Sequence, residues 1–304
     1  MKENNDRLGI TLMILTSFVF ALQDGISRYL AENYSILTVV MLRYWFFAAF
    51  VITLSASRGG GIARVARSGQ PLLQIFRGVL LASEICVMIA AFVLLGLIES
   101  HAVFAIYPLL IAALSGPVLG EHVGWRRWSA IGIGLVGVLV VLRPGLRVFA
   151  PEALVPFLAA LMFALYGLLT RRAARTDSAE TSFFYTGVAG AVAITLVGPF
   201  FWEPMQGWVD WTWMATLCLT GVTGHFLLIK TYEVAEASLV QPFSYFQLVF
   251  VTLIALGIFD ERLDPLTALG GGLILGAGIY TILRTARAAR GGRKRERRMA
   301  AWRI

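Results

Sequence analysis

Residues 20–28 read Phe-Ala-Leu-Gln-Asp-Gly-Ile-Ser-Arg, and residues 163–171 read Phe-Ala-Leu-Tyr-Gly-Leu-Leu-Thr-Arg. Four of the nine positions are identical at a constant offset of 143, and Ser27 against Thr170 is a conservative exchange. Each stretch lies at the end of a long apolar run. The match predicts that one helical unit occurs twice in the chain.

A second matched pair supports this repeat. Gly120-Glu121 follows an apolar run and precedes a glycine-rich one, and Asp260-Glu261 does the same at an offset of 140. Similar offsets for two independent pairs favour a duplicated unit of about half the chain.

The composition places the repeat in a membrane. Hydrophobic residues make up 58% of the 304 positions and the mean hydropathy is +0.75, whereas soluble domains are roughly 45–50% apolar. Charged residues make up only 14%, and they cluster between the apolar runs, as in proteins with many membrane spans. The chain leaves no room for a soluble domain.

Crossing the ~30 Å hydrocarbon core takes about 20 helical residues. Ten segments fit, at residues 8–30, 36–55, 71–97, 101–119, 125–142, 151–170, 181–201, 211–232, 238–259 and 265–284. Because five spans per unit is an odd number, the second unit enters the membrane from the opposite face. We therefore expect an all-α membrane protein of ten transmembrane helices, with two five-helix inverted-topology repeats (1–149 and 150–284) around a central cavity and a basic tail (285–304).

Loop charges indicate the orientation. With both termini cytoplasmic, 20 of the 26 lysines and arginines lie on the cytoplasmic side and four on the other, as the positive-inside rule requires. The basic run from Arg284 to Arg298 is typical of a segment that contacts anionic lipid after a final span, and we expect no nucleic-acid partner. The sequence predicts a multi-pass protein of a bacterial inner membrane, with a retained first helix and cytoplasmic termini.

Residue types that bind metals show no ligand spacing. Cys86 and Cys218 lie in separate apolar segments, and His101, His122 and His225 lie on three different segments. Neither a disulfide framework nor a zinc site is predicted. We expect no metal and no cofactor.

Several stretches, most of them in the second half, share a pattern of span endings. They are Leu119-Gly120-Glu121, Gly224-His225 through Ala235, Ser238-Leu239-Val240, Pro242-Phe243, Tyr245, Phe259 to Arg262 and Gly276 to Tyr280. This pattern resembles the drug/metabolite transporter superfamily, specifically its EamA-type ten-helix exporters, and among them the bacterial aromatic amino-acid exporters. The resemblance implies a cavity lined by spans one, three, four, six, eight and nine, with spans five and ten at the periphery. The chain departs from the pattern at Asp260 and at Gln23-Asp24.

Ionisable groups inside spans are costly and are therefore candidates for function. Asp24 lies late in the first span, where pairing with Arg28 at i, i+4 near the outer surface is favoured over a cavity role. Glu84 lies midway along the third span with no local partner. Glu84 could be a cavity-facing proton site or contact an amine of the substrate. A buried, protonated and hydrogen-bonded glutamate is the equal alternative.

His225 follows the small residues Gly221 to Gly224, which predict a turn in the eighth span. It could contact substrate or change charge near neutral pH, and a histidine bonded between helices is the equal alternative. Proline in matched spans of the two repeats points to a binding site, with Pro108 and Pro242 as candidate kink or gate residues and packing kinks as the alternative. The candidate cavity residues are Gln23, Asp24, Glu84, Phe104, Tyr107, Tyr166, His225, Gln241, Ser244 and Tyr245.

Positive charge is scarce near the expected cavity centre, because Arg43, Arg77 and Lys230 are predicted nearer the span ends. A phosphorylated substrate would require such a charge. Aromatic, amide, hydroxyl and imidazole groups in an apolar wall suit a net-neutral, partly apolar metabolite. An amino acid with an aromatic or other large neutral side chain fits this description.

Small residues in the fifth and tenth spans let helix backbones approach closely. They are Ala130, Gly134, Ala268, Gly272 and Gly276. Packing within a monomer explains them, and a weak homodimer through these spans is the alternative.

These features favour a secondary transporter, not an enzyme, that exports small metabolites by alternating access of two inverted bundles. Glu84 favours proton coupling, whereas the lack of an evident paired carboxylate favours facilitated flux. A lipid scramblase or flippase would keep the fold and change the cargo. An intramembrane enzyme would need Ser115 and His225 within hydrogen-bond reach, which no motif here enforces.

Overall fold

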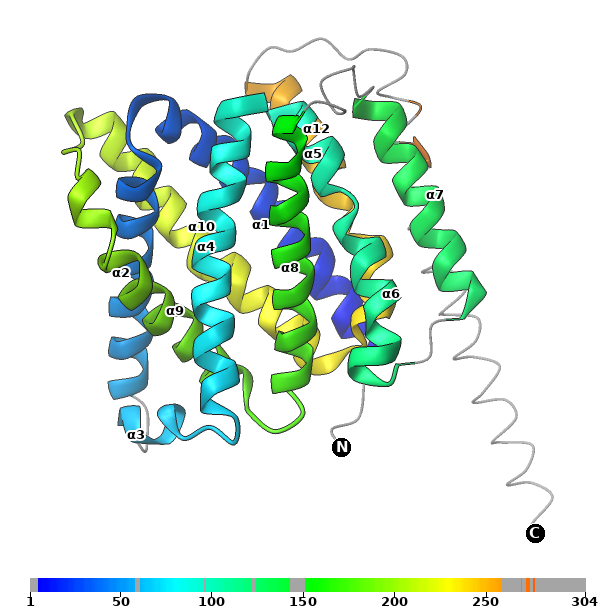
Figure 1. Ribbon diagram of the computed structural model, residues 1–304, viewed down its shortest axis with the longest axis horizontal. Coiled ribbons are helices and arrows are strands. Elements are labelled where there is room, and N and C mark those ends of the chain that lie inside the picture. Colours follow the sequence, from blue (N-terminus) through cyan, green and yellow to red (C-terminus); the bar gives the residue numbers. More distant parts are fainter. Residues whose placement is uncertain are drawn as a thin grey trace.

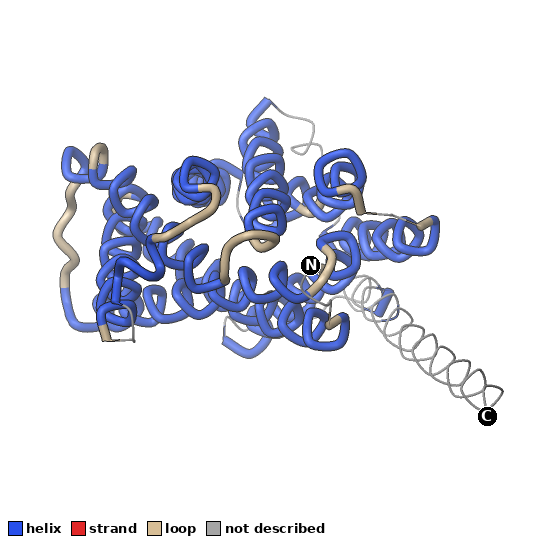
Figure 2. Tube along the Cα trace, turned by 90° about the horizontal axis from the view of Figure 1, so that it is seen from below, coloured by secondary structure: helices blue, strands red, loops and turns tan. Residues whose placement is uncertain are grey.

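The computed structural model describes residues 5–57, 61–95, 97–121, 124–142 and 151–258, together with residues 269, 272, 273 and 276. Helices and the loops between them account for these residues, as Figure 2 shows in a view from below. Apart from those four positions, the predicted span at 265–284 and the basic tail at 285–304 lie outside the described residues.

Long helices run through the bundle, and short ones lie at its ends or at breaks (Figure 1). The long helices are α1 (Asp6–Asn33), α2 (Ile36–Ala56), α4 (Pro71–Leu95), α7 (Trp125–Leu142), α8 (Leu154–Ala173), α9 (Ala179–Thr195) and α10 (Gly207–Val234). The short ones are α3 (Gly61–Ala66), α5 (Leu97–Phe104), α6 (Tyr107–Leu119), η2 (Pro151–Ala153), η3 (Gly198–Phe201), α11 (Ala237–Ser244) and α12 (Phe246–Ile258).

Each predicted span up to α12 coincides with one helix or with a pair of helices. The helices α1, α2, α4, α8 (with η2) and α10 are each long and apolar enough to cross a membrane. The spans predicted at 101–119 and 238–259 are broken, the first at Ala105-Ile106 and the second at Tyr245. Each break lies within three residues of a proline, Pro108 or Pro242.

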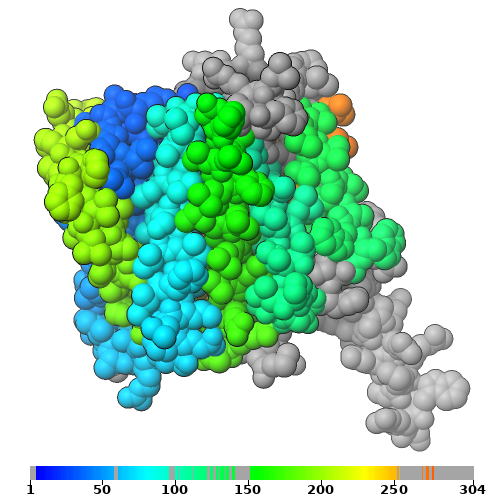
Figure 3. Space-filling view, viewed as in Figure 1, coloured from blue at the N-terminus to red at the C-terminus, as the bar shows by residue number. Residues whose placement is uncertain are grey.

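The bundle has a lower end, marked by α3 in Figure 1, and an upper end, where the green helix α8 begins. The helices α1, α4 and α12 rise from the lower to the upper end, whereas α2, α6 and α8 descend. The helix α1 packs along α10, and α4 contacts both α8 and α9. Figure 3 shows α4 and α8 side by side on the near face.

The outer surface is apolar, as a lipid-facing surface must be. Leu72 and Phe76 of α4 are exposed on it. Exposed tryptophans gather around the start of α10 at the upper end, as in the aromatic belts that mark a membrane interface. They are Trp202, Trp208, Trp211 and Trp213.

Three glycines in the fifth and tenth spans, among them Gly272 and Gly276 of the predicted set of small residues, have open space beside them. A Cβ atom at Gly132, Gly272 or Gly276 would meet no other atom within 4 Å. The described residues therefore show no close helix contact at these glycines, and a weak homodimer through this surface stays a prediction.

Candidate functional site

A polar cavity lies between the middle of the bundle and its upper end. Its lining residues on α1 and α4 fall in the upper halves of these two rising helices, and the rest of the wall comes from α2, α5, α8, α10 and α12. The wall is partly aromatic, with Phe20, Phe92, Phe104 and Phe163. Its polar members are Gln23, Asp24, Ser27, Arg43, Glu84, His101, His225 and Gln247.

The cavity is small in this conformation. Its volume is about 50 Å³, which is room for a few water molecules, whereas ligand pockets are typically on the order of 300 Å³ or more. The lining helices must therefore move apart to admit a metabolite. Phe104 and Gln247 of the wall lie next to the two helix breaks, where the backbone already bends.

Asp24 faces this cavity and not Arg28. Its Oδ2 accepts a 2.6 Å hydrogen bond from Gln247 Nε2 and lies 3.5 Å from His101 Nε2. Arg28 instead donates to Glu32 at 3.0 Å, and both of those side chains are about half exposed. The predicted ion pair between Asp24 and Arg28 is therefore wrong. Arg28 has an acidic residue four positions away on either side, and the solvated pair forms without desolvating either charge.

Arg43 is a cavity residue that the sequence analysis missed. It enters from α2, is only 2% exposed, and places its Nη2 3.0 Å from His225 Nε2. The expectation that Arg43 lies outside the cavity, and that span two takes no part in the lining, is wrong. The Arg43 side chain can extend to the cavity because α10 has a glycine, Gly221, beside it. A Cβ atom at Gly221 would lie 2.7 Å from Arg43 Nε. The signal that identifies Arg43 in the sequence is its charge within a span.

His225 lies within the continuous helix α10, so the predicted turn at Gly221 to Gly224 is wrong. The two glycines serve close packing instead. A Cβ atom at Gly224 would lie 2.7 Å from the ring of Phe20, and that ring packs 5.2 Å from the imidazole of His225. Phe47 and Tyr166 contribute further ring contacts at 6.3 and 6.5 Å. The imidazole is thus held between α1, α2 and α8.

Glu84 lies in the α4 wall of the cavity and is 4% exposed. The cavity therefore combines one guanidinium, two carboxyl groups and two imidazoles with an aromatic wall. Groups of both charge signs can contact a single bound molecule there.

Most of the buried side-chain atoms that lack a hydrogen-bond partner belong to this cavity. Among the described residues, they are Gln23 Oε1, Arg43 Nε, His101 Nε2 and His225 Nδ1 in the cavity wall, with Tyr44 Oη and Gln241 Oε1 elsewhere. Buried polar groups are normally paired. Their concentration in one cavity makes it the candidate ligand-binding site.

The predicted cavity residues divide into two sets. Those that line the cavity are Gln23, Asp24, Glu84, Phe104 and His225. Those that are buried outside its wall are Tyr107, Tyr166, Gln241, Ser244 and Tyr245, together with Pro108 and Pro242. Tyr245 nonetheless joins the two helix breaks, since its hydroxyl donates to the carbonyl of Ala105 at 3.3 Å.

Tyr166 holds the place in the second repeat that Gln23 holds in the first, but it lies toward the lower end. The helix α8 descends where α1 rises. The matched pair Phe20 and Phe163 meets at the cavity, with ring centroids 6.4 Å apart, and three residues further on Gln23 lies toward the upper end and Tyr166 toward the lower end. The hydroxyl of Tyr166 accepts a hydrogen bond from Arg77 Nη1 at 3.2 Å.

Arg77 is fully buried and has a complete set of partners toward the lower end. It donates twice to Gln74 Oε1, at 2.9 and 3.1 Å, and once to Thr170 Oγ1 at 3.1 Å. It also donates to the backbone carbonyl of Ser182. These bonds tie α4 to α8 and α9.

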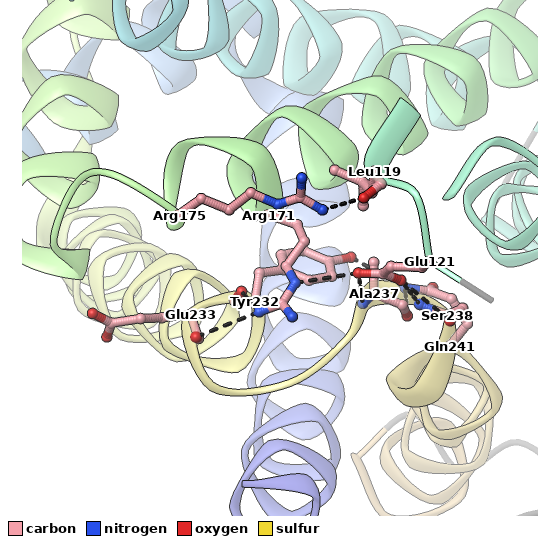
Figure 4. A network of polar contacts seen from close by, with 9 residues as sticks. All are labelled: Leu119, Glu121, Arg171, Arg175, Tyr232, Glu233, Ala237, Ser238 and Gln241. Atoms are coloured by element: carbon pink, nitrogen blue, oxygen red, sulfur yellow. Dashed lines mark hydrogen bonds and ion pairs between the residues drawn. The ribbon is translucent and has the colours of Figure 1, made fainter. Parts of the chain in front are cut away.

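Glu121 forms a second junction at the lower end (Figure 4). Its carboxylate accepts from Arg171 Nε at 3.2 Å and from the backbone N–H groups of Ala237 and Ser238, both at 3.3 Å. Gly120 makes this possible, because its φ of +67° ends α6 in the left-handed conformation that favours glycine. Glu121 of the first half thus caps α11 of the second half.

Asp177 forms a third junction, in the loop between α8 and α9. It accepts hydrogen bonds from Gln74 Nε2 at 2.8 Å, Ser68 Oγ at 2.5 Å and the Gly69 N–H at 2.9 Å. Burial alone would raise the pKa of this carboxyl, but the hydrogen bonds outweigh burial and hold the pKa below its ordinary value of 3.8. The lower end is therefore closed by paired polar groups.

A second cavity, of about 310 Å³, lies toward the lower end between α2, α3, α9 and α10. Its wall is mainly apolar and includes Phe50, Phe183, Phe184 and Phe226. Glu180 is its one charged lining residue, and Glu180 pairs with Arg64 at 2.9 Å. This cavity does not combine the two charge signs.

The EamA-like transporter family matches the chain twice, over residues 7–143 and 151–284. The chain belongs to this family. The resemblance to the EamA family drawn from the span endings is thereby confirmed, and the likeness to aromatic amino-acid exporters within it stays a prediction. A crystal structure with a TM-score of 0.73 and 22% identity, covering 90% of this chain and 97% of the other, has the same fold. The all-helical two-repeat membrane fold predicted from the sequence is confirmed.

Relatives within the EamA-like family carry different cargoes. The S-adenosylmethionine uptake transporter of Rickettsia prowazekii is 24% identical over 90% of this chain and 92% of the relative. The riboflavin transporter of Vibrio cholerae is 24% identical over 88% and 85% of the two chains. The pseudopaline exporter CntI of Pseudomonas aeruginosa is 24% identical over 89% and 94%.

As a member of the EamA-like family, this protein is a multi-pass membrane transporter of small metabolites and not an enzyme. The geometry also separates the two residues that the alternative of an intramembrane enzyme would bring together. Ser115 lies on α6 next to the Glu121 junction, where its carbonyl accepts from the N–H groups of Gly120 and Glu121. Ser115 is outside the cavity that His225 lines.

Proposed function

We propose that this transporter carries an amino-acid-like metabolite, with a carboxylate, a positively charged ammonium or sulfonium group and a bulky apolar part. One observation carries the proposal. Arg43 from α2, Asp24 from α1 and Glu84 from α4 line a single cavity with aromatic walls. Buried charges cost several kcal/mol each unless they are paired, and a substrate with charges of both signs supplies partners for both.

The charged groups that a metabolite carries decide how well it matches this cavity, and the candidate cargoes differ in these groups. Aromatic and other large neutral amino acids carry one carboxylate and one ammonium. S-adenosylmethionine carries the same two groups, a sulfonium and a flat adenine ring. Riboflavin has neither a carboxylate nor an ammonium and matches this cavity poorly. The cavity supports the amino-acid cargo predicted from the sequence and extends it to S-adenosylmethionine.

Alternating access follows from the inverted repeats. In this conformation the lower end is closed by Arg77, Glu121 and Asp177, and the cavity lies toward the upper end. An exchange of conformation between the repeats would open the lower end and close the upper one. We propose that the lower end is cytoplasmic, as the loop charges predict, and that the net direction is export.

Flux in proteoliposomes tests the proposal. Vesicles that contain the purified protein are loaded with radiolabelled tryptophan, phenylalanine, S-adenosylmethionine or riboflavin, and efflux is compared with protein-free vesicles. We expect saturable flux of at least one zwitterion and little flux of riboflavin. Flux of riboflavin alone, or scrambling of a fluorescent phospholipid without metabolite flux, would overturn the proposal.

A further inference from the structure

We infer that Arg43 and His225 form the subsite that binds the carboxylate of the substrate. The inference rests on the proposed function and adds the place in the cavity where one end of the cargo binds. Both side chains line the cavity, from α2 and α10, and are 2% and 3% exposed.

The contact between these two side chains fixes the protonation of His225. A guanidinium has five donors and no acceptor. In the 3.0 Å contact between Arg43 Nη2 and His225 Nε2, the imidazole nitrogen must therefore be the acceptor. It follows that the ring is neutral and carries its proton on Nδ1.

The pair consequently presents two donors that have no acceptor. Arg43 Nε and His225 Nδ1 are both buried and both lack a hydrogen-bond partner among the described residues. Leaving a buried donor unpaired is costly, and more so for a charged one. An anionic acceptor bound beside the pair removes both costs.

A carboxylate suits this pair better than a phosphate. Two oxygens match two free donors, one of which is cationic, and such charge-assisted bonds are the strong ones. A phosphate ester presents three oxygens and up to two charges, for which the cavity offers a single guanidinium. Gln23 Oε1 and the carboxyl groups of Asp24 and Glu84 supply acceptors that suit the cationic end of the substrate.

Packing holds the subsite in place. A Cβ atom at Gly221 would lie 2.7 Å from Arg43 Nε, so this glycine leaves the space through which the guanidinium passes α10. The rings of Phe20 and Tyr166 lie 5.2 and 6.5 Å from the imidazole of His225 and restrict its rotation. A rigid pair of donors discriminates between ligands better than a mobile one.

Binding of matched ligands to the purified full-length protein tests the inference. The probes are tryptophan and its primary amide, which keeps the ammonium and the indole but has no carboxylate, and S-adenosylmethionine with its decarboxylated form. The wild-type protein is expected to bind the acid of a pair about tenfold or more tightly than its partner. In Arg43→Gln this preference should fall to within about threefold, while binding of the amide or amine changes little.

Two further variants keep the test decisive. His225→Asn should reduce the preference in the same way, and it replaces Arg43→Gln if that variant fails to fold. Arg64→Gln removes an exposed arginine at the lower end and should leave the preference unchanged. If the wild-type protein binds no zwitterion, both the proposed function and the inference fall. If it prefers the acid but Arg43→Gln and His225→Asn keep that preference, the inference alone is wrong.

Discussion

Among the residues that the structure describes, two arginines are buried, and their surroundings differ sharply. Arg77, toward the lower end, donates to Gln74, Tyr166, Thr170 and Ser182 and is fully buried. Arg43, in the cavity, contacts His225 and leaves its Nε unpaired. Desolvating a guanidinium is costly at both places. Where the protein meets that cost with its own acceptors, the arginine closes the bundle. Where it does not, the arginine is left to bind a substrate.

Replacing each arginine by methionine should separate these roles with the largest effects. Arg77→Met leaves Gln74 Oε1 without a donor and removes the guanidinium hydrogen bonds to Tyr166, Thr170 and the Ser182 carbonyl. It should destabilise the protein by on the order of 3 kcal/mol. In Arg43→Met, His225 Nε2 is the one buried acceptor that loses the donor seen in the structure. The free energy of unfolding should change by less than about 1 kcal/mol. The substitution should nevertheless abolish zwitterion flux. Thermal unfolding in detergent and proteoliposome flux measure the two effects. Equal destabilisation by both variants would refute the contrast.

A similar contrast applies to two buried carboxyl groups. Glu121→Gln weakens charge-assisted bonds to Arg171, Ala237 and Ser238 and should destabilise the protein by about 2 kcal/mol. Glu84→Gln, in the cavity wall, should keep the wild-type melting temperature and lower flux about tenfold or more. Glu180→Gln serves as the matched control, because its exposed pair with Arg64 contributes about 0–1 kcal/mol. Undiminished flux of Glu84→Gln would remove Glu84 from the site.

Gly221 tests whether the position of Arg43 matters. In Gly221→Ala, the added methyl group would lie 2.7 Å from Arg43 Nε and must displace the guanidinium. We expect zwitterion affinity to fall about tenfold, since a charged hydrogen bond is lost or bent. Gly132→Ala on α7 meets no atom within 4 Å and should be neutral or slightly stabilising. Titration calorimetry compares the variants, and equal affinities would contradict the expected effect.

The smallest expected effect concerns pH and Asp177. Its folded-state pKa lies below the ordinary 3.8, so its contribution to stability is fully present above the ordinary pKa. The contribution is lost as the pH falls through the folded-state value. Asp177→Asn should therefore cost about 1 kcal/mol near neutral pH, and the gap to wild type should close below about pH 4. Melting temperatures between pH 3 and 7 measure the gap. A gap that widens on acidification would give the wrong sign.

The sequence predicts the fold well because membrane helices leave a strong local signal. Apolar runs of about 20 residues identify the spans, and the matched phrases at 20–28 and 163–171 identify the repeat. The buried polar residues Gln23, Asp24, Glu84 and His225 are also identifiable, because polar groups within spans are rare. Each of these inferences depends on the local composition of short stretches of the chain, or on a comparison between two such stretches.

What the sequence does not predict depends on contacts between helices. Arg43 reaches the cavity because Gly221, far away in the chain, has no side chain. The spacing of Arg28 allows a pair with either Asp24 or Glu32, and only the fold shows that Asp24 turns inward. Tyr166 matches Gln23 by offset, but because α8 runs opposite to α1, Tyr166 lies toward the lower end, where it accepts a hydrogen bond from Arg77. In this protein, matched positions in the repeats have different partners.

The central claim is that the unpaired polar groups of the cavity bind the substrate. An experimental structure with bound tryptophan or S-adenosylmethionine tests it most directly. We expect a carboxylate oxygen within about 3.2 Å of Arg43 Nε or His225 Nδ1, with the cationic group beside Gln23, Asp24 or Glu84. A ligand whose carboxylate lies away from Arg43 and His225, or one bound in the apolar cavity beside Phe184 and Phe226, would contradict it.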